Sequence, residues 1–254
     1  MLSLQERHQK ILDMLNNQGE VRVNELSRIF EVSEVCIRND LSELEGKGML
    51  SRVHGGAVST YEPYYNMSLG QRSNTNKEEQ DKIAAKIADM IQDNQAVMMN
   101  AGTTPLAVMR KLTNKNNITI ITNSIVLALA GAKYKNFRIV LLSGEVDFEY
   151  QFVYGASTLK QLDEYYADKF IMSADGIDVN GGISTYYDQE AEISRKMIDH
   201  SKSTIAALDY TKIGRAALKK FADVKDIGCL VTIASASEII LEELKDCGVK
   251  TVLA

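Results

Sequence analysis

Three short stretches at the start of the chain carry hydrophobic residues at the spacing of an α-helix. The first runs from Leu4 to Leu15. The second is expected to follow an N-cap at Asn24, and its apolar residues are Leu26, Ile29 and Phe30. The third follows a capping residue, Ser33, and its apolar residues are Ile37, Leu41 and Leu44. The pattern predicts three helices, of which the last two are joined by a tight turn.

Two short extended runs follow the third helix. They cover residues 49–53 and 57–58, and His54, Gly55 and Gly56 between them favour a turn. Two helices joined by a tight turn and followed by a hairpin are typical of a winged helix-turn-helix, in which the second helix enters the major groove of DNA. Many helical hairpins share this pattern without binding DNA, so the pattern by itself also allows a purely structural role.

The rest of the chain changes character twice. Residues 59–76 are polar and aromatic and show no period, which is typical of a linker. From residue 77 onward, helical stretches alternate with seven apolar, strand-like runs: 96–99, 118–121, 138–142, 169–173, 204–208, 229–233 and 249–253. This alternation predicts an α/β domain over 77–254 with a mostly parallel open sheet, separate from a mainly α-helical domain over 1–58.

Polar and small residues follow five of the predicted strands. Because ligands bind at the carboxyl ends of strands in an open parallel sheet, these residues are candidate ligand contacts. Gly102, Thr103 and Thr104 combine close backbone approach with a helix N-terminus, which suits an anion of the size of phosphate. The other candidates are Asn123, Ser124, Gly144, Asp175, Asp178 and Lys212. Together they suit a polyol that carries negative charge, although such residues also simply form and cap turns between strands and helices.

Composition narrows the class of protein. The 254 residues are 45% hydrophobic and 25% charged, as in an ordinary soluble globular protein of two domains. No apolar run is long enough to cross a bilayer and the N-terminus lacks the apolar segment of a signal peptide, so a cytoplasmic protein is expected. The three cysteines lie far apart, and no metal or cofactor is expected. The net charge of −5 does not by itself favour a nucleic-acid partner.

The N-terminal residues resemble the signature of DeoR-type bacterial transcription regulators. The matching positions are Arg7, Ile11, Leu15, Gly19, Val21, Leu26, Ser33, Ile37, Arg38, Asp40, Leu41, Leu44, Glu45, Gly48, Leu50, Arg52, His54, Gly55 and Gly56. The rest is similar to the effector domain of that family at residues 102–104, 122–124, 144–145, 175–178, 190–191, 209, 212 and 214–215. The resemblance implies a winged-helix domain joined to an α/β domain related to ribose-5-phosphate isomerase and glucosamine-6-phosphate deaminase. Such proteins are mostly oligomeric repressors of sugar or polyol operons that sense a phosphorylated sugar or polyol.

The resemblance also implies roles for individual residues. DNA contact is expected at Arg22, Ser33, Glu34, Arg38, Asn39, Ser42, Arg52, His54, Gly55 and Gly56. Among these, Arg38 and Asn39 would read bases, whereas Arg52 and His54 would touch the backbone or the minor groove. Asp40 is expected to orient an arginine. In the second domain Gly102, Thr103 and Thr104 would bind the phosphate, Asn123, Asp175, Asp178 and Glu190 the hydroxyls, and Lys212 the remaining charge.

The chain departs from the family pattern at three places. Asn39 and Asn100 stand where an arginine and an aspartate are common, and Asp147 and Glu149 follow Gly144 where arginine is common. An asparagine can bond bidentately to adenine, so the operator preference is expected to differ. The two carboxylates would repel a phosphate, which leaves open whether the effector is phosphorylated.

Charge and chemistry leave two function classes to compare. Residues 1–58 contain seven Lys and Arg against nine Asp and Glu, a net charge of −2, so one domain alone should bind DNA weakly. Specific binding is expected from a dimer or tetramer that engages paired half-sites. The alternative is a sugar-phosphate isomerase or deaminase with an accessory DNA-binding domain, in which Asp175 or Glu190 abstracts a proton and Lys212 stabilises an enediolate. The full winged-helix signature favours the regulator.

Overall fold

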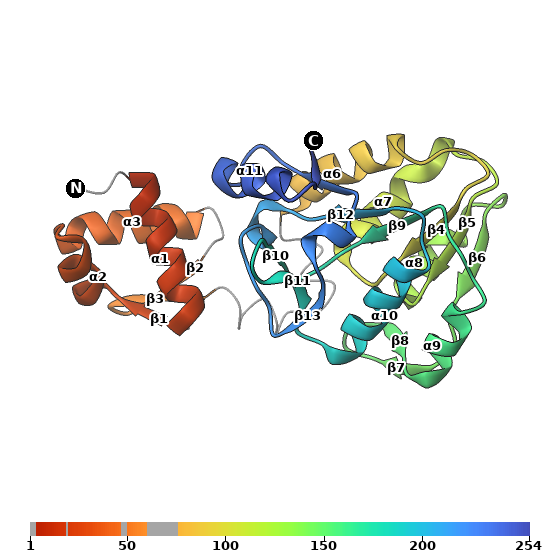
Figure 1. Ribbon diagram of the computed structural model, residues 1–254, viewed down its shortest axis with the longest axis horizontal. Coiled ribbons are helices and arrows are strands. Elements are labelled where there is room, and N and C mark those ends of the chain that lie inside the picture. Colours follow the sequence, from red (N-terminus) through yellow and green to blue (C-terminus); the bar gives the residue numbers. More distant parts are fainter. Residues whose placement is uncertain (1–3, 19, 47–49, 60–75) are drawn as a thin grey trace. The chain divides into compact units, whose positions relative to one another are not determined.

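The chain forms two compact units, Met1–Met67 and Ser68–Ala254 (Figure 1). We call them the N-terminal unit and the C-terminal unit. The computed structural model describes residues 4–18, 20–46, 50–59 and 76–254. Of the predicted linker only Ser59 and Asn76 are described, so its bounds stay a prediction.

The N-terminal unit contains three helices and a small sheet. Its elements are α1 (Leu4–Gln18), β1 (Glu20–Arg22), α2 (Val23–Phe30), α3 (Glu34–Gly46), β2 (Leu50–Val53) and β3 (Gly56–Ser59). The strands are antiparallel in the order β1-β3-β2. Inward-facing side chains from every element form one core: Ile11, Leu15, Val21, Val23, Leu26, Phe30, Ile37, Leu41, Leu44, Leu50 and Ala57. The predicted mainly α-helical fold with a hairpin is therefore confirmed.

Two details of the second helix differ from the prediction. α2 begins at Val23, so Asn24 lies inside the helix and is not its N-cap. Ile29 is 55% exposed, and Val23 is buried instead. The cause is tertiary, because Arg22 pairs with Gly56 in the sheet and the chain then passes directly from strand to helix. The apolar period of the helix does not show where that pairing ends.

The turn between α2 and α3 is short and well defined. Glu31 has a left-handed backbone (φ 55°) and donates its amide to the carbonyl of Ser27, which ends α2. The amide of Cys36 donates to Oγ of Ser33 at 3.2 Å, so Ser33 caps α3 as predicted. The helix-turn-helix geometry therefore rests on local hydrogen bonds of these four residues.

The C-terminal unit is built around a seven-stranded parallel sheet. In the order of the sheet, its strands are β15 (Lys250–Leu253), β14 (Cys229–Thr232), β12 (Thr204–Ala207), β9 (Lys169–Met172), β4 (Ala96–Met99), β5 (Thr119–Thr122) and β6 (Arg138–Leu141). Six of the seven predicted apolar runs contain one of these strands, and the run 118–121 overlaps β5 in three of its four residues. The prediction succeeded because the five inner strands are buried on both faces and therefore mainly apolar. The edge strands β6 and β15 are only partly buried but still carry two or three apolar residues in a row.

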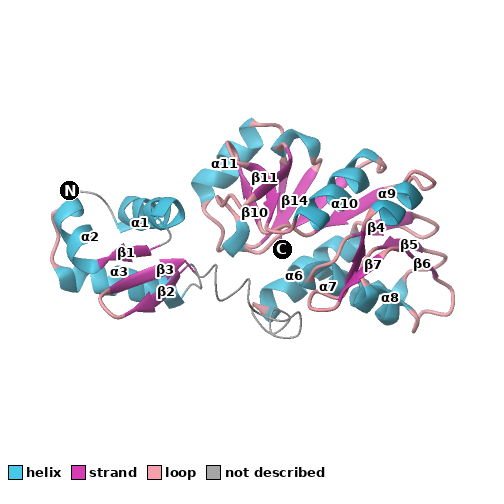
Figure 2. Ribbon diagram, turned by 90° about the horizontal axis from the view of Figure 1, so that it is seen from below, coloured by secondary structure: helices cyan, strands magenta, loops and turns pink. Residues whose placement is uncertain are grey.

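Helices cover both faces of this sheet (Figure 2). On one face lie α6 (Lys77–Asp89), α7 (Thr103–Lys111) and α8 (Ile125–Gly131), with α7 packed between the other two. On the other lie α9 (Ala156–Leu162), α10 (Asp188–Asp199) and α11 (Glu238–Asp246). The chain winds outward from β4 through β5 to β6, and then outward in the opposite direction from β9. The winding therefore reverses between β4 and β9, and this reversal places the candidate site.

Five short strands outside the main sheet were not predicted. β7 (Glu145–Asp147) and β8 (Phe152–Tyr154) form a hairpin, and β10 (Gly176–Asp178), β11 (Gly182–Thr185) and β13 (Lys219–Ala222) form an antiparallel sheet. Residues 176–178, expected as part of a polar turn, are thus a strand. Three 3₁₀ turns complete the unit: η1 (Leu112–Asn114), η2 (Tyr210–Lys212) and η3 (Val224–Asp226).

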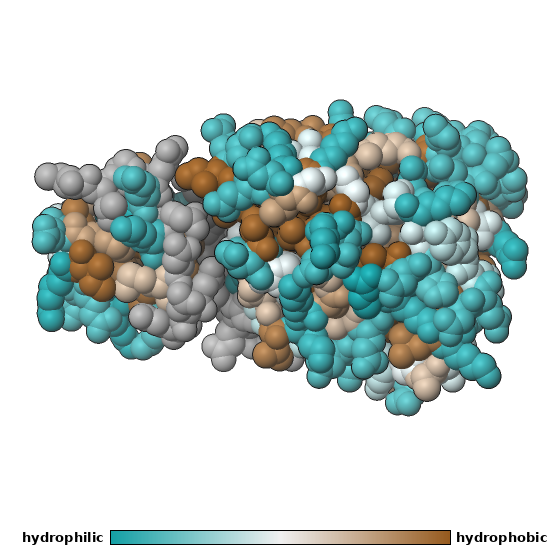
Figure 3. Space-filling model, in the orientation of Figure 1, coloured by the Kyte–Doolittle hydropathy of each residue, from teal (hydrophilic) through white to brown (hydrophobic). Residues whose placement is uncertain are grey.

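Hydrophilic side chains predominate on the face in Figure 3, with hydrophobic groups between them. Large apolar side chains are still exposed at separate places, for example Phe148 after β7 and Leu218 before β13. Among the helices that the structure describes, none is long and apolar enough to cross a membrane.

Candidate functional site

The outward face of α3 carries the polar residues expected to contact DNA. Glu34, Arg38, Asn39 and Ser42 are all exposed, and the capping residue Ser33 is exposed as well. The helix therefore buries one apolar face in the core of the unit and presents a polar face to solvent, as a recognition helix requires.

Asp40 lies on the buried side of α3 and binds Arg7 of α1. Nε and Nη2 of Arg7 donate to the two carboxylate oxygens at 2.5 and 2.9 Å. This hydrogen bonding raises the pKa of Arg7 above its ordinary value. Nε2 of His8 lies 3.3 Å from Oδ1 of the same carboxylate. Asp40 thus orients an arginine, as expected, and in doing so joins α1 to α3.

Arg7 and His8 were not predicted as the partners of Asp40. The available signal was an aspartate at an inward position of an amphipathic helix, because a buried carboxylate needs a cationic or hydrogen-bonding partner. Which side chain supplies it depends on how α1 packs against α3.

Each of the three arginines expected at the DNA is paired with a glutamate. Nη2 of Arg38 lies 2.7 Å from Glu34, and Nη2 of Arg22 lies 3.2 Å from Glu20. Glu45 accepts the amide of Arg52 at 2.8 Å and lies 3.9 Å from its Nε. The three pairs are thus Arg22 with Glu20, Arg38 with Glu34, and Arg52 with Glu45.

The turn of the wing contains exposed and buried residues. His54 and Gly55 are exposed, and the backbone of Gly55 has φ 80°, which favours glycine. Gly56 is buried, and a Cβ there would lie 2.1 Å from the carbonyl oxygen of Val21. Gly56 is therefore required by the packing of β3 against β1, and its contact with DNA stays a prediction.

In the C-terminal unit, Asn100 joins the two strands between which the winding reverses. Its Nδ2 donates to the carbonyl of Ser173 at 2.9 Å and to Oγ of Ser194 at 3.0 Å. Its Oδ1 accepts the amide of Ser173 at 2.8 Å. Asn100 is fully buried and holds the carboxyl ends of β4 and β9 together. Open α/β sheets bind ligands outside such a point of reversal.

The segment Gly102–Thr104 lies at this point, at the N-terminus of α7. A Cβ on Gly102 would lie 2.6 Å from Cβ of Ser173, so glycine lets the loops after β4 and β9 approach closely. Thr104 is buried and Thr103 is half-buried. The N–H groups and the positive dipole end of α7 are suited to an anion.

A cluster of polar residues forms where the loop after β9, the end of β11, the first turn of α10 and the η2 turn after β12 come together. Oγ1 of Thr185 lies 2.9 Å from Oδ2 of Asp175 and 3.2 Å from Oε2 of Glu190. Nζ of Lys212 lies 4.0 Å from Oδ1 of Asp175, and its side chain is almost fully buried. The structure thus brings together Asp175, Glu190 and Lys212, three of the predicted ligand residues.

Two further residues of this cluster were not predicted. Thr185 links the two carboxylates, and the amide of Tyr186 donates to Asp175 at 3.2 Å. Burial raises the pKa of the Tyr186 phenol to about 12, so it stays a neutral donor at pH 7. Both residues come at the end of β11, a strand that the apolar pattern did not reveal.

Asn123 and Ser124 serve the fold. Oδ1 of the fully buried Asn123 accepts the amide of Ala101 at 3.1 Å. Oγ of Ser124 accepts the amide of Leu127 at 3.3 Å and caps α8. These contacts match the alternative that residues after strands form and cap turns, and a contact of Asn123 or Ser124 with a ligand stays a prediction.

Asp178 and Gly144 also serve the local backbone. Oδ1 of Asp178 accepts the amides of residues 180 and 181 at 2.9 and 2.7 Å, which shapes the turn between β10 and β11. A Cβ on Gly144 would lie 2.3 Å from Oγ1 of Thr158. Asp147 likewise accepts the amides of residues 149 and 150 within the β7–β8 hairpin. The roles of Asp178 and Gly144 in ligand binding stay predictions.

Aromatic side chains lie next to the loop after β4. Tyr150 and Phe152 pack with Ala101, and Tyr154 and Tyr187 pack against them. The rings of Tyr150 and Tyr187 have centroids 4.4 Å apart. Tyr150 and Phe152 carry no motif that a sequence search would find. Both are buried, and they pack with Ala101, the residue before Gly102.

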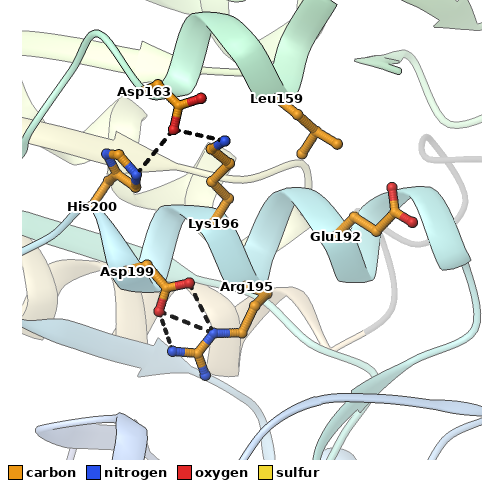
Figure 4. A pocket seen from close by; sticks show the side chains of 7 residues that line it. All are labelled: Leu159, Asp163, Glu192, Arg195, Lys196, Asp199 and His200. Carbon is orange, nitrogen blue, oxygen red and sulfur yellow. Dashed lines mark hydrogen bonds and ion pairs between the residues drawn. The ribbon is translucent and has the colours of Figure 1, made fainter. Parts of the chain in front are cut away.

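A separate open groove of about 450 Å³ lies between α9 and α10 (Figure 4). Nζ of Lys196 lies 2.7 Å from Asp163, and Nε2 of His200 lies 3.5 Å from the same carboxylate. Hydrogen bonding from Lys196 lowers the pKa of Asp163. Arg195 binds Asp199. The cations of the groove are therefore engaged, and none of the predicted ligand residues lines it.

In the described part of the chain, no group of three or more His, Cys, Asp or Glu side chains is arranged to hold a metal ion.

Two family models match the chain, one in each unit. The DeoR-like helix-turn-helix domain matches residues 7–62, and the DeoR C-terminal sensor domain matches residues 75–233. The chain belongs to the DeoR family. A member of this family is a transcription regulator rather than an enzyme, and its C-terminal unit is the sensor domain.

Curated relatives match over nearly the whole chain. The HTH-type transcriptional regulator GolR of Listeria innocua is 30% identical over 98% of both chains. The HTH-type transcriptional repressor GlcR of Bacillus subtilis is 31% identical over 97% of this chain and 95% of that protein. The glycerol-3-phosphate regulon repressor of Escherichia coli is 30% identical over 95% of each.

Two solved structures align with part of the chain at low identity. Ribose 5-phosphate isomerase A from Neisseria gonorrhoeae is 14% identical, with a TM-score of 0.41 over 57% of this chain and 55% of that chain. The tetrameric eIF2B-beta2-delta2 complex from C. thermophilum gives a TM-score of 0.43 at 13% identity, over 82% of this chain and 72% of that chain.

Proposed function

We propose that this DeoR-family regulator binds operator DNA through α3 and the wing and represses a carbohydrate or polyol operon. A sugar phosphate or related polyol at the carboxyl edge of the sensor sheet controls that binding. The observation that carries the proposal is the joining of an exposed polar face on α3 to a sensor domain whose Asp175, Glu190 and Lys212 meet beside the reversal of the sheet.

The chemistry of α3 supports base reading. Arg38 and Asn39 are exposed side by side, and in a major groove they pair bidentately with guanine and adenine. Ser42 is exposed one turn further along the helix. The net charge of −2 over residues 1–58 makes one unit a weak ligand of DNA, so we propose an oligomer that places two units on paired half-sites. Such a regulator acts in the cytoplasm, where bacterial DNA is.

The chemistry of the sensor site supports a small anionic polyol. Asp175 and Glu190 are acceptors for hydroxyl groups, whereas Lys212 and the N-terminus of α7 attract an anion. The name of one relative, the glycerol-3-phosphate regulon repressor, is consistent with a phosphorylated polyol. The ligand changes DNA affinity only if it binds one arrangement of the oligomer more tightly than another.

The proposed contact of α3 with DNA is tested with Arg38→Ala. A duplex is first selected from a random pool by the parent protein, and its affinity is then measured for both proteins. We expect a loss of about 10- to 100-fold, because one bidentate base contact is removed. Arg110→Ala, at an exposed arginine of α7, is the matched control and should bind as the parent does. Equal affinity of Arg38→Ala and parent would exclude α3 as the reading helix.

Ligand binding by the sensor domain is tested by thermal unfolding in the presence of glycerol 3-phosphate, ribose 5-phosphate, glycerol or ribose. A ligand at about 100 times its Kd should stabilise the sensor domain by about 2.7 kcal/mol. Lys212→Met should abolish the shift from the phosphates and leave DNA binding in place. A shift from the unphosphorylated polyols alone would show that phosphate is not the recognised group.

A further inference from the structure

The DNA-contact surface is internally neutralised in the absence of DNA. The three arginines expected at the DNA lie on three different elements, β1, α3 and β2, and each has an acidic partner of its own. These six side chains are between 44% and 56% exposed, so they lie at the surface and not in the core. The pairing is therefore a property of the contact surface and is not needed to bury charge.

The acidic partners are a selected subset of the acidic residues of the unit. Glu25 and Glu31 are also exposed, yet within the described part of the unit neither makes an ion pair. The glutamates thus accompany the three arginines expected at the DNA, whereas the exposed Arg28 has no acidic partner among the described residues of the unit. Within the same described residues Lys10 is also exposed and unpaired, so the neutralisation is confined to the arginines expected at the DNA. With a net charge of −2 over residues 1–58, the unit attracts a phosphate backbone weakly.

We propose that Glu20, Glu34 and Glu45 are specificity-determining residues that suppress binding to non-specific DNA. This proposal rests on the proposed function, because it requires that the same surface contacts DNA. A glutamate beside an arginine repels a nearby phosphate and competes with it for the guanidinium. Non-specific binding consists almost entirely of phosphate contacts, so it carries the full effect of this competition.

Operator binding is affected less. Glu34 engages only Nη2 of Arg38 among the hydrogen bonds that the structure describes, and a guanidinium has five N–H donors. Arg38 can therefore keep its glutamate while other donors meet a base edge, and Glu34 then holds the guanidinium in place. The glutamates lower the affinity for random DNA more than the affinity for the operator.

The test uses the full-length double variant Glu20→Gln/Glu34→Gln. Glutamine keeps the size and the hydrogen-bonding oxygen and removes the charge. Glu45 is left unchanged, because it also accepts the backbone amide of Arg52 and supports the wing. The probes are a random-sequence duplex of defined length and the duplex that the parent selects from a random pool. Affinity for each is measured over a series of salt concentrations.

We expect the double variant to bind the random duplex about tenfold more tightly, because two exposed ion pairs, each worth roughly 1.4- to 5-fold in an equilibrium constant, no longer compete. The slope of log affinity against log salt should steepen by up to about 1.8, or about 0.9 for each arginine that gains a phosphate. The ratio of selected-duplex to random-duplex affinity should fall.

The control is Glu25→Gln/Glu31→Gln, which changes the net charge by the same amount at unpaired positions. It should bind the random duplex within about threefold of the parent and keep the parent's salt slope. Equal gains for the two double variants would overturn the proposal, since only net charge would then matter. A parent that selects no duplex would overturn the proposed function itself, which keeps the two failures distinguishable.

Discussion

The N-terminal unit and the sensor domain keep their candidate functional residues in opposite environments. On α3, Arg38, Asn39 and Ser42 are exposed. In the sensor domain, Asn123 is 0% and Lys212 is 6% exposed. The first arrangement suits a large partner that covers a surface, and the second suits a small ligand that enters between loops.

Whether a polar residue is exposed or buried decides how much its position says about its role. A polar side chain in water needs no partner, so an exposed residue on α3 is available to DNA. A buried polar side chain must be hydrogen-bonded, either to the protein or to a ligand. Asn123 is satisfied by the backbone, whereas Asp175 lies in a cluster with Glu190 and Lys212. Similar positions after parallel strands thus have different roles.

The largest expected effect is at Arg7, which is buried, whereas the candidate functional residues on α3 are exposed. Arg7→Met leaves the carboxylate of Asp40 buried without its cation and should cost about 3–5 kcal/mol of unfolding free energy in that unit. Hydrogen–deuterium exchange of the full chain should become faster in α1 and α3. The exchange rates in the sheet of the sensor domain should stay the same.

Arg38→Met is the matched control for Arg7→Met. It removes an exposed arginine from the same unit and should change stability by no more than about 0.5 kcal/mol. Equal losses in the two variants would contradict the distinction between the buried and the exposed arginine.

A smaller effect is expected at the reversal of the sensor sheet. Asn100→Ala leaves the amide and the carbonyl of Ser173 without their side-chain partner and should cost about 2–3 kcal/mol. Asn180→Ala, at an exposed turn, should cost less than about 0.5 kcal/mol. Urea unfolding of both variants checks this. An unchanged midpoint for Asn100→Ala would mean that the loops after β4 and β9 hold together without this side chain.

The smallest effect, in the sensor domain again, depends on pH. Asp168 accepts the amide of Ala96 at 3.0 Å and binds Nζ of Lys202 at 2.7 Å, and these bonds lower the pKa of its carboxyl group. Such a group stabilises the fold above its unfolded pKa of about 3.9, and the stabilisation is lost as the pH falls through the lower, folded pKa. Asp168→Asn should therefore cost about 1.5 kcal/mol at pH 7 and progressively less below pH of about 4.

Unfolding free energies of Asp168→Asn and parent, measured from pH 7 down to pH 3, check this sign. A difference that grows as the pH falls would rule out an ionised Asp168 as the stabilising form.

The strands of the main sheet could be predicted from the sequence, whereas the short strands outside it could not. Apolar runs revealed the strands of the main sheet, because the five inner strands are covered by helices on both faces and the edge strands β6 and β15 keep short apolar runs. The strands β10 and β11 were missed, since each is three or four residues long and contains polar residues such as Asp178 and Thr185. β10 pairs with β11, and β11 also pairs with β13, about 35 residues further along the chain, so the sheet depends on tertiary pairing.

Some residues of the candidate site could likewise be predicted from the sequence, and others could not. The positions of Asp175 and Lys212 after predicted strands, and the family motif at Glu190, identified three residues that the structure brings together. Thr185 and Tyr186 were missed with β11, and Arg7 was missed as the partner of Asp40. Arg7 and Asp40 are 33 residues apart, and Thr185 and Tyr186 meet Asp175 through the pairing of β10 with β11, so neither apolar period nor motif spacing indicates these contacts.

By itself the sequence determined the two-part organisation, the helix-turn-helix, the strands of the parallel sheet and the family, because these depend on local periodicity and on motifs of adjacent residues. Only the tertiary structure decided which polar residues serve the fold and which meet in the sensor site. It alone placed Asn100 across the reversal between β4 and β9 and paired Arg22, Arg38 and Arg52 with glutamates. The physical reason is that a polar group's role depends on which partner reaches it, and that partner is set by packing.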